Sequence, residues 1–398
     1  MMRKMLDGNG AVAEAMRLAK IQVVSAYPIT PQSPISERLA DFVADGSLNA
    51  KYIRVESEHT AMACAIGAQL TGVRAGTATS SVGLALMHEV IGVAAGCRVP
   101  IVMPIVNRAL VSPWSLWCDH QDAMAVRDSG WLQFYVENAQ EVLDMTLMAY
   151  HIAEDQRVQL PAMVCLDGFF LSHMTDVVIV PDQETVDCFL PPFKTHNLYL
   201  DPNDPMFIND LTPPDDFTEM RFQQQDAFDK ALKVIPEIMD KFTVMFGREH
   251  FMVEPYCCED AEAVLITMGS MSGTAKHTVD QLRKEGKKVG MIKILSFRPF
   301  PVDLLRQYLA KVPRIGVLDR SASLGAESGP LSIEVRAALI REKDQQDIFS
   351  FIGGLGGRDV PPETMEKAFN LLLADKPLRN TVWVDVKENA LNIREVIV

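Results

Sequence analysis

Small hydroxylic and acidic side chains follow three short segments in the first 81 residues. Thr30, Glu58 and the trio Thr79, Ser80 and Ser81 each stand where a predicted strand gives way to a helical pattern. In open α/β sheets, ligands bind in the crevice just beyond the carboxyl ends of the strands. The spacing therefore predicts one rim at which these polar groups meet a ligand.

Glu58 can serve in either of two roles. As the first residue of the predicted helix 58–70, with Ser57 as its cap, the carboxylate would stabilise the helix N-terminus. Glu56 and His59 crowd the same rim, however. A carboxyl in a low-polarity interface has a raised pKa and can share a proton with a ring nitrogen. The residues alone leave both roles open.

A second chemical group is the guanidinium of Arg108, which follows the fully apolar segment 100–106. Most Arg side chains form surface salt bridges, but the Arg fork also matches a carboxylate with two parallel hydrogen bonds. Asn107 is placed to orient that fork. Thr30 stands between two prolines, and such a rigid support favours a ligand contact about as much as an ordinary turn. We therefore expect Arg108 and Thr30 at the rim beside Glu58.

The run Asp119-His120-Gln121-Asp122 has the residue types of a cation site or an acid–base cluster. Metal sites usually draw ligands from more than one contiguous run, so a hydrogen-bonded loop or lid is the favoured interpretation. The seven cysteines include no CxxC pair, and their spacing fits neither zinc nor an iron–sulfur cluster. The glycine clusters at 269–273 and 353–357 lack a phosphate-loop signature and predict tight turns. No metal ligand is assigned.

The elements that must position these groups alternate between strand and helix, as in a doubly wound α/β domain. This domain is expected over residues 1–180. Its predicted elements are helix 8–20, a helix capped by Ser33, strand 51–56, helix 58–70, strand 75–80, a single helix 82–96, strands 100–106, 130–136 and 160–167, and helix 138–156.

Proline recurs through residues 181–259, where we expect a connecting arm and a helix at 223–246. Such a track is either a disordered linker or an arm wrapped on another surface, and its aromatic and aliphatic residues favour the arm. A second doubly wound domain is expected over 260–398. Its predicted strands are 263–267, 289–295, 315–318 and 348–352, and its predicted helices are 273–285, 302–309 and 331–340.

The 398 residues carry 52 acidic and 38 basic side chains, a formal net charge of −14. This balance argues against nucleic acid or an anionic membrane as the main partner. The first ten residues contain no apolar run that could serve as a secretion signal, and the most apolar helix is too short to span a bilayer. A cytoplasmic protein is expected.

Eight segments of the chain, in order and with matching spacing, resemble the α subunits of pyruvate:ferredoxin oxidoreductases (pyruvate synthases) within the 2-oxoacid:ferredoxin oxidoreductase family. They are Tyr27-Pro28-Ile29-Thr30-Pro31, Val55-Glu56-Ser57-Glu58-His59, Thr77-Ala78-Thr79-Ser80, Asn107-Arg108-Ala109-Leu110, Asp119-His120-Gln121-Asp122, Asp167-Gly168-Phe169, Phe297-Arg298-Pro299-Phe300-Pro301 and Gly354-Leu355-Gly356-Gly357-Arg358-Asp359. The chain departs locally from the family pattern at residues 113–118 and 328–330.

The resemblance implies a thiamine diphosphate enzyme of several subunits, active only when assembled. This chain would supply the pyrimidine-binding domain and a domain similar to the C-terminal domain of transketolase. A β subunit would hold the diphosphate, magnesium and a 4Fe-4S cluster, while γ- and δ-type subunits would complete the assembly. The reaction would convert pyruvate and CoA to acetyl-CoA and carbon dioxide and reduce ferredoxin, or run in reverse.

The resemblance also implies residue roles. Glu58 would bond the aminopyrimidine ring and favour its imino tautomer, which removes the proton from the thiazolium carbon. Arg108 would bind the 2-oxo acid carboxylate, and Thr30 would hydrogen-bond the substrate; these three are the predicted catalytic residues. The other implied contacts are Pro28, Ile29, Thr79 and Ser80 for the cofactor and Asn107 for the substrate.

Two alternatives remain open. The same family includes enzymes for branched-chain 2-oxo acids and 2-oxoglutarate, although a single Arg at the rim favours a monocarboxylate, because a second carboxylate would need a second cation. The other alternative is a non-redox thiamine enzyme subunit or a structural subunit with a vestigial site.

Overall fold

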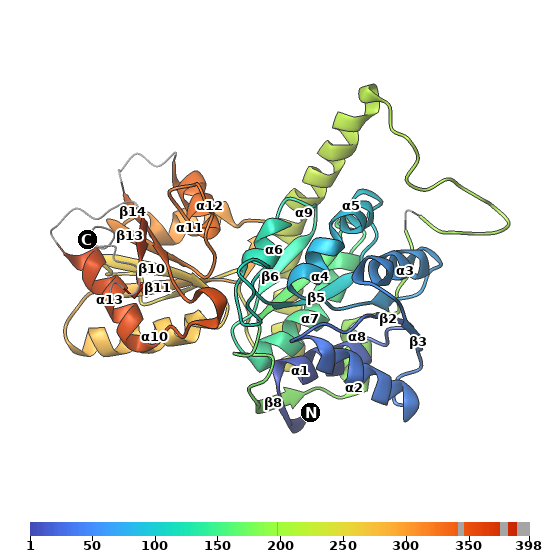
Figure 1. The fold of residues 1–398 in the computed structure, drawn as a ribbon, viewed down its shortest axis with the longest axis horizontal. Coiled ribbons are helices and arrows are strands. Elements are labelled where there is room, and N and C mark those ends of the chain that lie inside the picture. Colours follow the sequence, from blue (N-terminus) through green and yellow to red (C-terminus); the bar gives the residue numbers. More distant parts are fainter. Residues whose placement is uncertain (197, 341–345, 375–380, 388–398) are drawn as a thin grey trace.

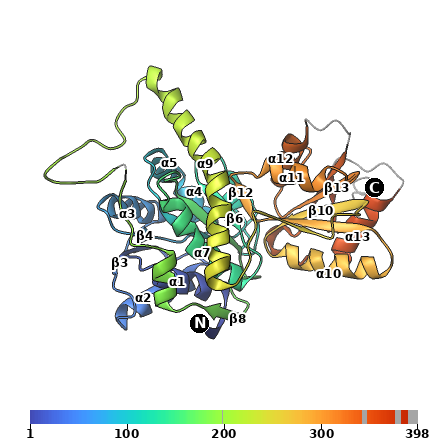
Figure 2. The same cartoon turned by 180° about the vertical axis from the view of Figure 1, so that it is seen from behind.

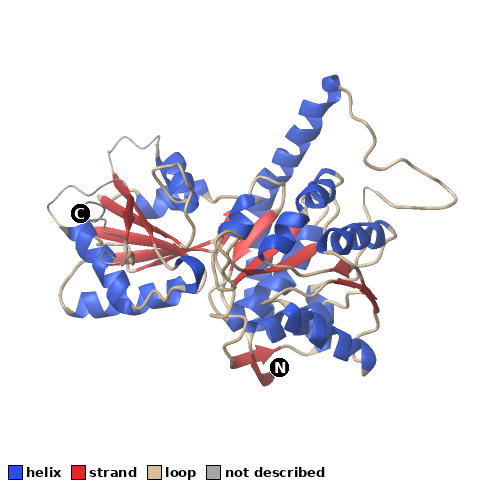
Figure 3. Ribbon diagram, in the orientation of Figure 1, coloured by secondary structure: helices blue, strands red, loops and turns tan. Residues whose placement is uncertain are grey.

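The computed structural model describes residues 1–196, 198–340, 346–374 and 381–387. Two α/β bodies stand side by side, and a long helix, α9, rises from the N-terminal one (Figure 1). Helices cover both faces of each sheet (Figure 3), so the predicted fold class of two doubly wound domains is confirmed.

The N-terminal sheet has seven strands in the order β12-β6-β7-β5-β4-β2-β3. All except β12 run parallel, and β5 and β7 are buried along their whole length. The six parallel strands are β2 (Val23–Ala26), β3 (Lys51–Arg54), β4 (Ala75–Gly76), β5 (Val102–Asn107), β6 (Leu132–Tyr135) and β7 (Ala162–Asp167). Because they run parallel, their carboxyl ends form one rim, as the sequence predicts.

The helices of this domain begin where the chain offers a cap. Ser57 accepts a hydrogen bond from the Thr60 amide and Asn138 accepts one from the Glu141 amide, as expected for N-caps. The helices are α1 (Gly8–Leu18), α2 (Ser33–Ala44), α3 (Glu58–Leu70), α4 (Ser81–Leu86), α5 (His88–Gly96), α6 (Gln121–Ala125) and α7 (Ala139–Glu154).

Two helix predictions are wrong in detail. Ser33 is not a cap but the first residue of α2, because the Gln32 and Ser33 amides both donate to the Ile29 carbonyl and need no side-chain acceptor. The expected single helix 82–96 is two helices, α4 and α5, which meet at Met87, where the amide is shared between the Gly83 and Leu84 carbonyls.

The N-terminus and the segment from β8 to α9 contain more structure than the sequence suggests. β1 (Met2–Leu6) pairs antiparallel with β8 (Asp176–Val180), and α8 (Gln183–Phe189) follows. α9 (Pro214–Phe246) begins at Pro214 rather than at residue 223, and its buried residues start only at Gln224.

The second domain is built on a six-stranded sheet in the order β15-β14-β13-β10-β11-β9. Among its described strands, β9 alone is antiparallel to its neighbour. The strands are β9 (Val253–Tyr256), β10 (Ala263–Met268), β11 (Val289–Ile294), β13 (Arg314–Asp319), β14 (Asp347–Ile352) and β15 (Thr381–Trp383). The helices are α10 (Met271–Lys284), α11 (Val302–Leu309), α12 (Pro330–Leu339), α13 (Pro362–Leu373) and the 3₁₀ turn η1 (Leu355–Gly357).

The two domains share more than a linker. β12 (Ser296–Arg298) leaves the second domain and pairs antiparallel with β6 at the edge of the first sheet. A strand from the connecting segment likewise joins the second sheet. β9 precedes residue 260, where the sequence places the start of the second domain, yet it pairs with β11. One apolar cluster continues from the first sheet into the second domain.

A buried ionic cluster also crosses the junction. The Lys293 ammonium on β11 lies 2.9 Å from a carboxylate oxygen of each of Glu137, Glu141 and Glu254. Lys276 on α10 adds a second cation, 3.0 Å from Glu137 and 2.9 Å from Glu254. These five residues are called the interdomain ionic cluster below.

Within the described ranges, none of the helices combines the length and the apolar composition that crossing a bilayer requires.

Candidate active site

Glu58 is the first residue of α3 and stands beyond the carboxyl ends of the parallel strands. Its side chain is buried, with 6% of the residue exposed. Its carboxylate makes no hydrogen bond or ion pair with the described residues. The Ser57 hydroxyl, not Glu58, caps the helix. The cap is thus supplied by Ser57, and the chemical role of Glu58 stays a prediction.

Gly83 on α4 keeps room beside this carboxylate. A Cβ on Gly83 would lie 2.6 Å from Glu58 Oε1 and 2.5 Å from Thr79 Oγ1, closer than real Cβ contacts allow. The Thr79 hydroxyl is buried and has no hydrogen-bond partner among the described residues. Two unpartnered polar groups thus face the same glycine. The sequence analysis missed Gly83, which sits inconspicuously in an apolar helical run.

Gly83→Ala is expected to lower stability, because the added methyl group overpacks the space shared by Glu58 and Thr79 at a cost of about 1–3 kcal/mol. Gly92→Ala on α5 is the matched control, since a Cβ there meets nothing within 4 Å. In that open helical position Ala should stabilise by roughly 0.5–1 kcal/mol. Denaturant melts of the two variants check this difference. Equal stabilisation by both alanines would show that Gly83 is an ordinary helical glycine.

Arg108 is buried and does reach the loop that carries Thr30. Its Nη1 donates to the Thr30 carbonyl at 2.8 Å, and its Nε donates to the Ser115 carbonyl at 3.3 Å. Its Nη2 makes no hydrogen bond to the described residues. Thr30 is exposed on the loop after β2, together with exposed Pro28 and half-buried Ile29. The structure therefore brings Arg108 and Thr30 together, as the sequence predicts.

Asp122, which the sequence placed only in a structural loop, organises this side of the site. Its carboxylate accepts hydrogen bonds from the backbone amides of Arg108 at 3.0 Å and Ser81 at 2.9 Å, and from Asn107 Nδ2 at 2.8 Å. Burial raises the pKa of Asp122 to about 6, although these donors oppose the shift. Because Ser81 begins α4 and Arg108 follows β5, Asp122 links the two halves of the site.

Two predicted site residues are directed elsewhere. The Asn107 amide donates to Asp122 and does not contact the Arg108 fork, which corrects the expectation that Asn107 orients it. The Ser80 hydroxyl donates to the Val106 carbonyl at 2.7 Å, and the Ser81 hydroxyl donates to the Ala109 carbonyl at 2.5 Å. These two hydroxyls hold α4 against the end of β5, so Thr79 alone of the trio keeps its hydroxyl unpartnered.

His120 turns away from Asp122 and toward the second domain. Its Nε2 lies 2.7 Å from Asp167 Oδ1, and Asp167 also accepts from the Ser270 hydroxyl at 2.5 Å. Burial would raise the pKa of Asp167, but the His120 ring and the Arg320 guanidinium hold it well below its usual range. Cys118 Sγ lies within 4.8 Å of these ligand-type atoms. The hydrogen bonds make this group a contact between the domains, consistent with the predicted structural loop.

The two glycine clusters form tight turns at the same contact. Gly269 and Gly354 have positive φ, and Gly269 faces Asp167 so closely that its Cβ would lie 2.9 Å from Oδ1. Gly357 donates its amide to the Cys118 carbonyl at 2.6 Å. The second domain therefore supports the loop 115–120, from which Ser115 accepts the Arg108 hydrogen bond.

Comparison with known proteins identifies the family. The sequence model described as pyruvate flavodoxin/ferredoxin oxidoreductase, thiamine diphosphate-binding, matches residues 14–240. The model of pyruvate:ferredoxin oxidoreductase core domain II matches residues 261–365. The chain belongs to the pyruvate flavodoxin/ferredoxin oxidoreductase family, and the resemblance found in the sequence is confirmed.

Several curated relatives are similar over nearly their whole length. The pyruvate synthase subunit PorA of Methanothermobacter thermautotrophicus is 47% identical and covers 98% of this chain and 100% of its own. The PorA of Thermotoga maritima is 48% identical, with 92% and 93% covered. The ketoisovalerate oxidoreductase subunit VorA of Pyrococcus horikoshii is also 48% identical, with 90% of each chain covered.

Solved structures share the fold. A 2-oxoglutarate:ferredoxin oxidoreductase from Magnetococcus marinus superposes with a TM-score of 0.72 at 20% identity, covering 94% of this chain and 65% of that one. A split-gene transketolase, an inactive β4 tetramer, gives a TM-score of 0.54 at 12% identity, covering 92% and 94%.

Proposed function

We propose that this chain is the subunit of a 2-oxoacid:ferredoxin oxidoreductase that binds the pyrimidine end of thiamine diphosphate, and that the assembled enzyme interconverts pyruvate and acetyl-CoA. The observation that carries the proposal is the buried Glu58 carboxylate, which has no partner among the described residues and faces Thr79 across Gly83. The names of the PorA relatives support pyruvate as the substrate.

The residues present fit an aminopyrimidine. Glu58 would hydrogen-bond a ring nitrogen, the Thr79 hydroxyl is a second unpartnered group beside it, and Pro28 and Ile29 would contact the ring from the loop after β2. When bound, thiamine diphosphate supplies the carbanion chemistry of 2-oxo acid cleavage. Ser80 would act on this pocket indirectly, because its hydroxyl holds α4 against β5.

Each polar group then has a task of its own. The Glu58 carboxyl would share a proton with the ring nitrogen, a transfer that favours a carboxyl shielded from water. Arg108 would bind the substrate carboxylate through Nη2, while Nη1 and Nε stay fixed on the Thr30 and Ser115 carbonyls. The exposed Thr30 would hydrogen-bond the substrate from the other side. Asn107 would contribute by holding Asp122.

The oxo acid is the open part of the proposal. The VorA relative is as similar as the PorA relatives, so a branched-chain acid is the second candidate. A panel of pyruvate, 2-oxoisovalerate and 2-oxoglutarate, assayed on the natively purified complex with CoA and a viologen acceptor, decides between them. A complex that reduces viologen fastest with 2-oxoisovalerate would overturn pyruvate. A complex that reduces it with none of the three would overturn the redox function.

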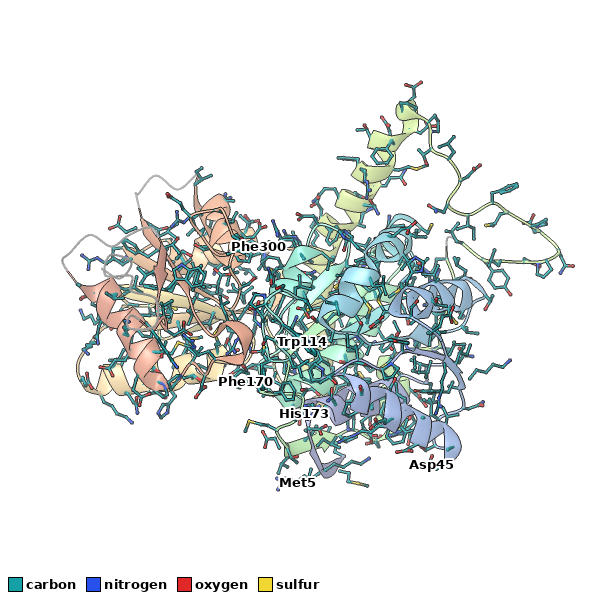
Figure 4. All side chains as sticks on the ribbon, viewed as in Figure 1. Met5, Asp45, Trp114, Phe170, His173 and Phe300 are labelled. Carbon is teal, nitrogen blue, oxygen red and sulfur yellow. The ribbon has the colours of Figure 1, made fainter. Side chains whose placement is uncertain are left out.

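Partner subunits would complete the site. Large apolar side chains stand exposed around the site on α4 and on the loop after Arg108, namely Val82, Leu86, Val111, Trp114 and Trp117. Figure 4 shows Trp114, together with Phe170, near the junction of the domains. Such a patch fits a protein interface. A β-type subunit seated there would supply the diphosphate grip, magnesium and a 4Fe-4S cluster, with γ- and δ-type subunits passing electrons to ferredoxin.

The isolated chain is expected to be colourless and inactive. All seven cysteines are free thiols distributed over the fold, and their spacing offers no cluster site. Iron analysis and a visible spectrum of the purified recombinant chain test this expectation, with the complete complex as the positive control. Stoichiometric iron and a broad visible absorption band in the chain alone would contradict it.

Arg108→Lys is expected to lower kcat/KM for pyruvate by about one to two decades, since losing part of a charge-assisted contact costs roughly 1.5–3 kcal/mol. Lys keeps the charge but has no planar fork. Arg98→Lys is the matched control, because the hydrogen bonds of Arg98 to the described residues all go to backbone carbonyls away from the rim, including that of Gln159 at 2.8 Å. Steady-state kinetics and thermal melts of both complexes are compared. Normal kinetics with lowered stability in the Arg108 variant would mean that the carboxylate is held elsewhere.

A further inference from the structure

Residues 198–223, called the arm below, stand apart from the rest of the molecule. In Figure 1 the chain swings away from α3 and α5 and returns along the first turns of α9, and the view from behind in Figure 2 agrees. Residues before Gln224 contribute nothing to the buried face of α9. The arm is anchored at its base, where the Leu200 amide donates to the Leu70 carbonyl at 2.9 Å.

Large apolar side chains are concentrated on the arm. Phe207 and Leu211 are each 92% exposed and Phe222 is 70% exposed. The others exposed there are Tyr199, Leu200, Met206, Phe217 and Met220. A hollow of about 560 Å³ lies between the arm and α5, lined by Phe207, Phe217 and Val93 among others. Contiguous apolar surface of this kind marks a protein interaction site.

The charge of the arm selects among partners. It carries six carboxylates and a single base, Arg221. The six are Asp201, Asp204, Asp210, Asp215, Asp216 and Glu219. The chain as a whole has a net charge of −14, so a second copy would oppose the arm with like charge. A surface complementary to the arm would have apolar pockets edged by Lys and Arg. Because this chain is acidic, a different polypeptide must supply that surface.

The backbone of the arm suits docking as well. Four prolines (Pro202, Pro205, Pro213 and Pro214) restrict φ along it, and the helical end is fixed by the buried half of α9. A restricted segment loses less conformational entropy when it binds.

We propose that the arm is a docking clamp for a different subunit of the same complex, whose contacting surface is apolar and edged with basic residues. This inference rests on the proposed function in one respect only, namely that partner subunits exist. It assigns to the arm a contact separate from the partner face around Glu58 and Arg108.

The test uses the full complex, co-expressed and purified with its partner subunits. Phe207→Ser combined with Leu211→Ser removes the two most exposed apolar groups of the arm. Val244→Ser is the control, since Val244 is 86% exposed but lies near the C-terminal end of α9, away from the arm. Losing two such buried side chains typically weakens an association by about 10²-fold or more. Native mass spectrometry over a dilution series should show at least a tenfold weaker retention of one partner subunit in the double variant alone.

A second variant tests the charge. Asp210→Lys combined with Asp215→Lys and Asp216→Lys should weaken the same contact. Its dependence on salt should also fall, because the variant lacks the attraction between arm carboxylates and basic partner residues that salt screens. Unchanged retention in both arm variants would overturn the clamp. So would a wild-type chain that self-associates through the arm when expressed alone, which would make the occupant a second copy.

The readout separates the two proposals. Partner loss confined to the arm variants, in a complex that turns over no 2-oxo acid, would leave the clamp standing and refute the proposed activity. An active complex that keeps every subunit in the arm variants would refute the clamp alone. A wild-type chain that purifies without any partner would refute both.

Discussion

Glu58→Gln is expected to lower kcat of the assembled enzyme by about 10²–10⁴-fold, the usual contribution of a positioned acid–base group. The glutamine keeps the size of the side chain and can hydrogen-bond a ring nitrogen, but it cannot exchange a proton with it. Because the Glu58 carboxylate makes no bond to the described residues and Ser57 already caps α3, folding should not depend on it. The effect should therefore appear in turnover and not in stability.

Steady-state kinetics on the complex, with thermal melts and a subunit count, measure this effect. Glu56→Gln provides the matched control, since Glu56 is exposed two residues earlier, in the bend before α3. Its turnover should remain within a factor of two or so of wild type, as expected for a surface change. Retention of more than a tenth of the activity in the Glu58 variant would falsify the acid–base role.

Lys293→Met should destabilise the protein by about 3–5 kcal/mol, the cost typical of breaking a buried ion pair on one side. The Lys293 side chain is 5% exposed and pairs with the three carboxylates of the interdomain ionic cluster. Methionine fills similar space but leaves the two glutamates to weaker partners, Lys276 at 3.0 Å from Glu137 and His250 at 3.6 Å from Glu141. Denaturant unfolding of the full chain, followed by two probes because the chain has two domains, measures the change.

The pH dependence gives that prediction a second check. Burial would raise the pKa of Glu141, but Lys293 and His250 hold it at about 2. The folded pKa is thus below the ordinary glutamate value of 4.5, so this pairing stabilises fully above that value and is lost as pH falls through about 2. The deficit of the Lys293 variant should therefore shrink in acid. Lys288→Met, which removes an exposed pair 3.8 Å from Glu262, should cost less than about 1 kcal/mol. Equal losses in the two variants would contradict the cluster's role.

Much of the fold could be predicted from sequence because its signals are local. Strands such as β5 and β7 are fully apolar, and caps such as Ser57 and Asn138 are followed by long helical patterns. The break at Met87 left no signal in the sequence, since the apolar pattern continues through it and the Met87 amide still bonds the Gly83 and Leu84 carbonyls of α4. β12 was equally hidden, because its partner β6 lies more than a hundred residues earlier.

The site was predictable in its strand-end groups but not in its supports. Thr79, Glu58 and Arg108 follow predicted elements, so their rim could be inferred. The Asn107 amide could not, because its direction depends on Asp122 from another loop. The importance of Gly83 follows only from the structure, in which a Cβ at this position would lie too close to Thr79 and Glu58.

The exchange of β12 between the domains bears on how the chain folds as it leaves the ribosome. Residues 1–259 can form six parallel strands of the first sheet, but β6 then presents a bare edge until Ser296–Arg298 has been synthesised. All four residues of β6 are buried in the finished protein, and an unpaired apolar edge is a template for aggregation. N-terminal domains commonly fold first during synthesis. Here the first domain stays incomplete until part of the second has emerged, so the two domains complete their folding together. Expressing the first domain alone would leave the β6 edge unpaired and exposed to solvent.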